Sequence, residues 1–169
     1  MREDLAQIAE TLLDYAENGK TFQTDKITTV PSGVYTDADL WQKEMDAVFK
    51  KLPLALAASA ELPEPGSYKA MEAVGLPILI TRDKDGHAHA FLNVCAHRGA
   101  PVADEGCGHK SRFTCKYHGW TYTNDGKLMG VAEAHTFGDV DKSTRGLTAL
   151  PCEEKSGLIF VTLTPGAEM

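Results

Sequence analysis

Two short segments of this sequence each place a cysteine close to a histidine. The first is Cys95-Ala96-His97-Arg98-Gly99, and the second is Cys115-Lys116-Tyr117-His118-Gly119-Trp120. Each segment adjoins predicted strands and has a glycine soon after its histidine, which predicts tight loops whose backbone N–H groups face a buried anion. The stretch between His97 and Cys115 is long enough for the chain to leave and return, so we expect the two loops to enclose one metal centre.

Thiolates and imidazoles in this arrangement suit more than one metal. A structural zinc site accepts two cysteines and two histidines, so a zinc-stabilised interaction module is one alternative. Zinc-finger sequences usually place the cysteines in one pair and the histidines in another, whereas each segment here holds one of each. A further alternative has no metal at all, and it requires both spacings to be coincidental.

The pattern Cys-x-His followed by Cys-x-x-His resembles the Rieske family of iron-sulfur proteins. The resemblance implies a Rieske-type 2Fe-2S cluster as cofactor, with Cys95 and Cys115 on one iron and His97 and His118 on the other. It also implies that the chain transfers single electrons. Neutral imidazoles in place of two thiolates remove negative charge from the cluster, which raises the reduction potential above that of an all-cysteine ferredoxin.

The residues around the two segments resemble the aromatic-ring-hydroxylating (Rieske non-haem iron) oxygenase alpha subunit. This likeness is carried by residues 91–99 and 115–122. The respiratory Rieske protein adds a disulfide between its loops, which the corresponding Ala100 and Tyr117 cannot form. Trp120 stands where that protein has a hydroxyl group bonded to a sulfur. The resemblance therefore implies a potential at the low end of the Rieske range.

The likeness spans roughly residues 35–164 and has two departures. Lys116 stands where proline is common, which puts a positive charge beside the cluster. Oxygenase alpha subunits also continue into a catalytic domain whose mononuclear iron is bound by two histidines and a carboxylate. The sequence has no histidine after His135, so we expect neither catalytic residues nor a mononuclear iron site. Whether the chain counts as an enzyme is left open, and a free-standing Rieske ferredoxin is an alternative to a fragment of an alpha subunit.

The remaining polar candidates have no predicted chemistry of their own. We expect surface or hydrogen-bonded histidines rather than metal ligands at His87, His89, His109 and His135. Cys107 and Cys152 are expected to be ordinary buried residues, with redox or ligand roles as the minor alternative. Arg98 is expected either to pair with a carboxylate or cap its loop, or to be solvated.

The charge and hydropathy of the chain limit the kinds of partner that it can bind. The net charge is -7 and the pI is near 5.3, with scattered cations, which argues against nucleic acid. No stretch approaches a membrane span or a targeting segment, so we expect a cytoplasmic protein that does not bind a membrane. The resemblance implies a reductase or ferredoxin as electron donor and an oxygenase catalytic domain, of this or a neighbouring subunit, as acceptor. His118 would be the exit residue.

The predicted fold is mainly β, a Rieske-type antiparallel β sandwich with two cluster-binding loops, preceded by one or two helices. We divide the chain into a helix and connector (1–34), a helix leading into the domain (35–53), the Rieske domain (54–164) and a tail (165–169). Apolar spacing predicts the first helix over 3–18, and the stripes of both helices are expected to be buried. The predicted strands are 67–74, 76–82, 87–94, 112–114, 119–123, 127–131, 147–150 and 157–163.

Overall fold

The computed structural model describes residues 2–23 and 26–169, which form two compact units, Met1–Asp37 and Ala38–Met169. The first unit holds helix α1 (Arg2–Glu17) and the short 3-10 helix η1 (Ser32–Tyr35). Gly19 ends α1 with φ +60°, the left-handed conformation typical of a helix C-terminus. The helix predicted over 3–18 is confirmed, but its apolar side chains Leu5 and Leu12 are 62% and 61% exposed.

The second unit begins with helix α2 (Ala38–Glu44), which continues into the π-helical turn η2 (Met45–Phe49). The hydroxyl of Thr164 donates to the carbonyl of Lys50 at 2.7 Å, which holds the end of this segment to the chain terminus. Trp41 and Phe49 are 57% and 38% exposed, so the expectation that this aromatic face is core was wrong. The apolar spacing predicts that a face is apolar, but burial also needs a covering element.

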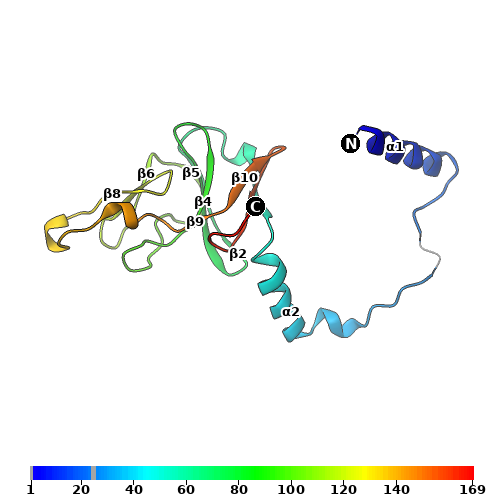
Figure 1. The fold of residues 1–169 in the computed structure, drawn as a ribbon, viewed down its shortest axis with the longest axis horizontal. Helices are drawn as coiled ribbons and strands as arrows, with labels where there is room; N and C mark the ends of the chain where they lie inside the picture. The colour runs from blue at the N-terminus through cyan, green and yellow to red at the C-terminus, as the bar shows by residue number, and fades with distance from the viewer. Residues whose placement is uncertain (1, 24–25) are drawn as a thin grey trace. The chain divides into compact units, whose positions relative to one another are not determined.

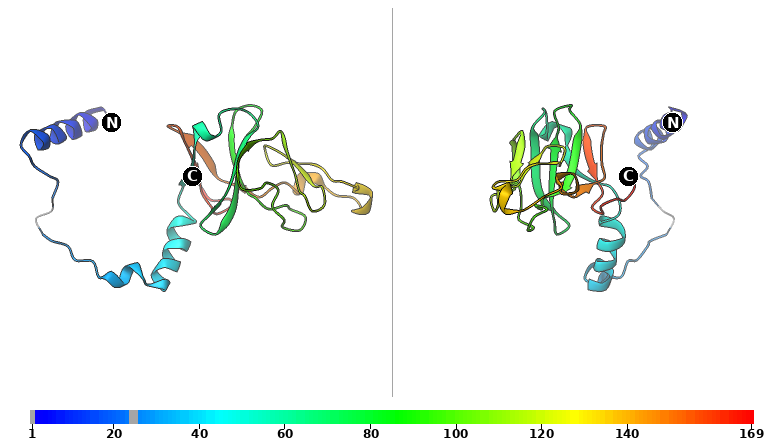
Figure 2. Two further views of the ribbon diagram at one scale, coloured as in Figure 1. Left: turned by 180° about the vertical axis from the view of Figure 1, so that it is seen from behind. Right: turned by 60° about the vertical axis from the view of Figure 1, so that its left-hand side comes forward.

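Eleven strands form three antiparallel sheets in this unit (Figure 1). The sheet orders are β1-β11-β10, β5-β2-β3-β4-β9 and β6-β7-β8. The bounds are β1 Leu54–Ala58, β2 Ser67–Ala73, β3 Leu76–Arg82, β4 Ala88–Leu92, β5 Gly106–His109, β6 Arg112–Thr114, β7 Thr121–Thr123, β8 Leu128–Gly130, β9 Ala149–Leu150, β10 Cys152–Lys155 and β11 Leu158–Val161. Figure 2 shows the green strands of the five-stranded sheet between the yellow and the orange-red strands of the other two. The predicted antiparallel β fold is confirmed.

The central strand of the five-stranded sheet, β3, is buried on both faces. Its successive residues point in opposite directions, so they enter two different cores. Leu79 belongs to a first core with Phe113 and Tyr122, on the side of β6-β7-β8. Ile78 and Ile80 belong to a second core with the apolar residues of β1 and β11. The two cysteines of the sequence motif, Cys95 and Cys115, are part of the first core.

A buried arginine ties the five-stranded sheet to β10. Arg82 is 8% exposed, and its guanidinium donates to both carboxylate oxygens of Glu154 at 2.9 Å and to the carbonyl of Leu62 at 2.5 Å. The bond from Arg82 lowers the pKa of Glu154 to about 2. This charge-assisted ion pair links β3 of the five-stranded sheet to β10 of the neighbouring sheet.

Three observed strands have no counterpart in the sequence-based prediction, namely β1, β5 and β10. The case of β5 is instructive, because its sequence Gly-Cys-Gly-His has little β propensity. It becomes a strand by pairing with β2, with Ser67 opposite His109 and Lys69 opposite Cys107. Tertiary pairing overrides local propensity here.

Within the described residues, no helix combines the length and the hydrophobicity that crossing a membrane requires.

Candidate metal centre

The two Cys/His segments form loops with the same backbone hydrogen bonds. In the first loop (95–100), the N–H of Cys95 donates to Ala100 at 2.8 Å, and Gly99 donates back to Cys95 at 3.0 Å. In the second loop (115–120), Cys115 and Trp120 repeat the first bond at 2.8 Å, and Gly119 repeats the second at 3.0 Å. The glycines have φ of +75° and +67°, so each loop uses the conformational freedom that the sequence predicted.

The first loop follows β4 and is fastened to the interior by Asn93. The side chain of Asn93, 5% exposed, accepts hydrogen bonds from the N–H groups of Val102 and Ala103 at 3.1 Å and donates to the carbonyl of Ala103 at 2.8 Å. These bonds satisfy backbone groups that burial has removed from water. They fix the chain on both sides of the first loop.

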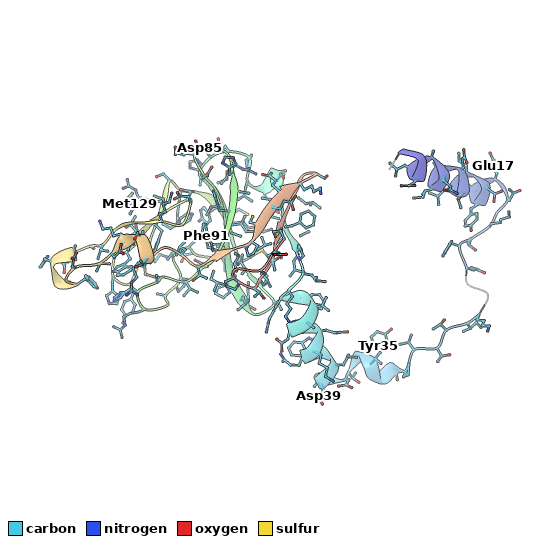
Figure 3. All side chains as sticks on the ribbon, viewed as in Figure 1. Glu17, Tyr35, Asp39, Asp85, Phe91 and Met129 are labelled. Carbon is cyan, nitrogen blue, oxygen red and sulfur yellow. The ribbon has the colours of Figure 1, made fainter. Side chains whose placement is uncertain are left out.

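The second loop connects β6 and β7, where Thr114 pairs with Thr121. The turn after β7 places Gly126, φ +79°, against the ring of Phe91 on β4. Phe91 is labelled in Figure 3. The hydroxyl of Thr81 donates to the carbonyl of Asn124 at 2.6 Å in the same buried contact. Strand β7, which follows the second loop, is therefore anchored to the five-stranded sheet at its other end.

The four predicted ligands lie as two pairs in these loops. Cys95 and Cys115 are 3% and 2% exposed and lie in one core. The imidazole rings of His97 and His118 have centroids 4.6 Å apart. Two buried sulfurs and two adjacent imidazoles are therefore the side chains that the sequence motif proposes as ligands.

The environment of His97 fits a metal ligand. Its Nδ1 is buried and has no hydrogen-bond partner, which for a polar atom is costly unless something else binds it. Desolvation and the neighbouring His118 and Arg98 lower the pKa of His97, so the ring favours the neutral form that a metal ligand requires. The residues present therefore fit an iron-sulfur group.

Aromatic side chains enclose the histidine pair. The indole of Trp120 stacks on His97 with centroids 5.1 Å apart and an interplanar angle of 10°. Phe137 packs edge-on against His97 at 5.2 Å. The sequence singled out Trp120, but it held no signal for Phe137, which reaches the site from a loop beyond β8.

Tyr122 on β7 contacts the first loop at two points. Its hydroxyl lies 3.2 Å from the sulfur of Cys95 and accepts the N–H of Ala96 at 3.0 Å. Because a thiolate only accepts, Tyr122 is the donor to a metal-bound Cys95. Burial and the contact with Cys95 raise the pKa of this phenol above its ordinary value, so the proton stays on the oxygen.

Zinc sites and Rieske clusters differ in how they use four protein ligands. A structural zinc site needs four protein ligands on one ion, whereas a Rieske cluster spreads its four protein ligands over two irons. Among the described residues, no three histidine, cysteine or acidic side chains form a group that could hold a metal ion.

Other predicted residues lie outside this centre. His89 contacts Asp83 at 2.7 Å, and His109 contacts the carbonyl of Pro65 at 2.9 Å, so both are hydrogen-bonded as expected. Arg98 lies over the ring of Tyr117, 5.5 Å from its centroid, a contact that the sequence did not predict. His87 and His135 are peripheral.

The two additional cysteines differ from each other. Cys107 is exposed, so the expectation of burial was wrong; it lies on β5, which is the edge strand of its sheet. Cys152 is half-buried, and desolvation raises the pKa of its thiol to about 11. It is therefore a protonated, unreactive side chain at neutral pH.

Comparison with known proteins gives a consistent result. Residues 53–144 match the model of the Rieske [2Fe-2S] domain. The sequence is 33% identical to benzene 1,2-dioxygenase subunit alpha of Pseudomonas putida over 91% of this chain and 36% of that protein. It is 32% identical to the anthranilate 1,2-dioxygenase large subunit of Acinetobacter baylyi over 82% of this chain and 30% of that protein.

Solved structures agree with the sequence relatives. The quaternary ammonium Rieske monooxygenase CntA in complex with L-carnitine superposes with a TM-score of 0.76 and 33% identity, covering 83% of this chain and 40% of that chain. Naphthalene 1,2-dioxygenase from Rhodococcus sp. gives a TM-score of 0.76 and 35% identity, covering 83% and 32%. The chain thus spans about a third of the length of the curated relatives it matches.

Proposed function

Since this chain belongs to the Rieske [2Fe-2S] domain family, we propose that it transfers single electrons as the N-terminal part of a ring-hydroxylating oxygenase alpha subunit. The cluster would be held by Cys95 and Cys115 on one iron and by His97 and His118 on the other. The observation that carries this proposal is a pair of loops with matching backbone bonds, whose two sulfurs are buried in one core and whose two imidazole rings lie side by side.

The chain's own residues would perform three tasks around the cluster, which when bound supplies reversible one-electron chemistry. Tyr122 donates a hydrogen bond to the Cys95 sulfur, which favours added negative charge there. Trp120 and Phe137 cover His97 and keep water from it. The half-buried His118 faces the surface and is the residue through which an electron would leave.

The oxygenase context rests on the relatives. A reductase or ferredoxin would supply electrons, and a catalytic domain of this or a neighbouring subunit would receive them, with mononuclear iron bound there. A cytoplasmic location is part of this proposal, since the two cysteines outside the centre, Cys107 and Cys152, are free thiols, which suit a reducing compartment. The absence of a disulfide at Ala100 and Tyr117, with Trp120 in place of a hydroxyl, supports a potential at the low end of the Rieske range.

Anaerobic purification followed by metal, sulfide and EPR measurements tests the cluster. We expect iron and acid-labile sulfide in equal amounts and a Rieske EPR signal after reduction with dithionite. Cys115→Ser should abolish the signal, whereas Cys107→Ser, at an exposed cysteine, should leave it intact. Stoichiometric zinc without sulfide would instead establish the zinc-stabilised module.

A free-standing Rieske ferredoxin is the second candidate, and the helices α1 and α2 that precede the β domain argue against it, because that domain needs little beyond its packed sheets. The genomic DNA downstream of the coding region decides between them. An in-frame region with a His-x4-His pair supports the oxygenase, and a natural stop codon supports the ferredoxin.

A further inference from the structure

An ion pair joins the two loop regions at the surface. The ammonium of Lys116 lies 2.6 Å and 2.8 Å from the two carboxylate oxygens of Asp104. Lys116 is in the second loop and directly follows Cys115, whereas Asp104 lies beyond the end of the first loop. The contact therefore crosses between the two loops rather than closing one of them.

Asp104 is placed for this contact by the buried interior. It follows Ala103, whose N–H and carbonyl are both bound by the side chain of Asn93. The carboxylate thus extends from a fixed point of the backbone. Lys116, by contrast, has a long flexible side chain, so Asp104 decides where the ammonium rests.

Both side chains are largely exposed, 78% for Lys116 and 73% for Asp104. Exposed pairs add little to folding stability, so their main effect is electrostatic. The bond with Lys116 lowers the pKa of Asp104, which keeps the carboxylate charged and opposite the ammonium. The positive charge expected at this position from the sequence is therefore balanced by a negative one.

We propose that Asp104 is a positioning residue that holds Lys116 and cancels its charge beside the cluster, and so keeps the reduction potential low. This inference rests on the proposed electron-transfer function. A positive charge near the cluster stabilises the reduced state, because reduction adds a negative charge. Without Asp104, the ammonium would act on the cluster unopposed and would also be free to move.

Potentiometric titration of the holoprotein at low ionic strength tests this proposal. Asp104→Asn should shift the potential upward, and Lys116→Gln should shift it downward. The double variant D104N/K116Q should return it close to the wild-type value. Lys50→Gln removes a charge of the same sign from the surface ion pair with Asp46, in the helical segment that precedes the β domain, and should leave the potential unchanged.

Measurements at high salt and EPR spectra distinguish an effect of charge on the potential from an effect of loosened cluster-binding loops. The opposite shifts should shrink in high salt, because exposed charges are screened over about 10 Å at 0.1 M salt and over less at higher salt, while the EPR g values stay constant. Shifts of the same sign in both single variants, or three variants that coincide with the wild type, would overturn the role of Asp104 alone. A wild-type protein with no Rieske signal would overturn the proposed function and this inference with it.

Discussion

The first and second loops share one backbone pattern but are held by different means. The first loop is fastened from inside, by the buried side chain of Asn93 and by the hydroxyl of Tyr122. The second loop is carried by a backbone hairpin, and two of its side chains, Lys116 and Tyr117, are exposed. Its buried side chains, Cys115 and Trp120, belong to the first core, whereas the contacts of Lys116 and Tyr117 lie at the surface.

The residues around a metal centre have two roles, to fix the positions of the ligands and to adjust the charge and access around them, and the two loops divide these roles. Interior hydrogen bonds fix the position of a ligand, because each unsatisfied buried group is costly. Surface contacts leave the backbone unchanged and adjust charge and access. We therefore expect substitutions around the first loop to affect folding and those on the outer face of the second to affect electron transfer.

The largest effect is expected at Asn93. Asn93→Ala leaves the buried N–H groups of Val102 and Ala103 without their acceptor, which should destabilise the holoprotein by about 2 to 4 kcal/mol. Urea unfolding measures this. Asn18→Ala, at an exposed hydrogen bond on the N-terminal helix, serves as the control and should cost about 0.5 kcal/mol. A loss at Asn93 no larger than at Asn18 would contradict the interior anchoring of the first loop.

The two loop glycines form a matched pair for the next prediction. A Cβ at Gly119 would lie 2.6 Å from the Cβ of Ala132, whereas one at Gly99 meets nothing within 4 Å. Both have positive φ, so Gly99→Ala should cost about 1 kcal/mol from backbone strain, and Gly119→Ala about 1 to 2 kcal/mol more from the overlap. The two variants are compared by their unfolding midpoints and by their iron content. Equal losses would mean that the surroundings of the two loops do not differ at this position.

Tyr122→Phe should change the potential more than the fold. Losing the donor to the Cys95 sulfur removes about 1 kcal/mol of preference for the reduced state, which lowers the potential by ~40 mV. Tyr68→Phe, at a ring packed on Phe113 in the same core, is the control and should leave the potential unchanged. A potential that stays the same or rises in the Tyr122 variant would disprove donation to the sulfur.

The smallest effect is expected at Tyr117. Tyr117→Ala removes the ring under Arg98 and should cost about 0.5 kcal/mol. Tyr117→Phe keeps the ring and should behave as the wild type. Chemical denaturation resolves the difference, and a large loss with alanine would show that the outer face of the second loop also holds the fold.

Local signals explain what the sequence predicted. The ligand spacings and the turns ending at Gly86 and Gly126, which have φ of +87° and +79°, depend on residues a few positions apart. The antiparallel strands around these turns follow from another local signal, the alternation of apolar and polar residues. The ligand assignment itself stays a prediction until a cluster is measured, as do the domain boundaries.

Contacts between distant segments explain what the sequence did not predict. The pairing of Lys116 with Asp104 and the packing of Phe137 on His97 join residues whose spacing carries no pattern. The strand β5 exists only because β2 lies beside it. The exposure of Trp41 shows the same limit in reverse, since amphipathic spacing does not specify the covering partner.

The contact that anchors β7 bears on the rate of the proposed electron transfer. Gly126 packs against Phe91, and backbone bonds close both loops, so the backbone that carries the proposed ligands is held from several sides. A site that is already arranged for both oxidation states needs little nuclear rearrangement during the transfer. In the proposed function, the packing of a glycine turn on a phenylalanine would therefore help to keep the reorganisation energy low.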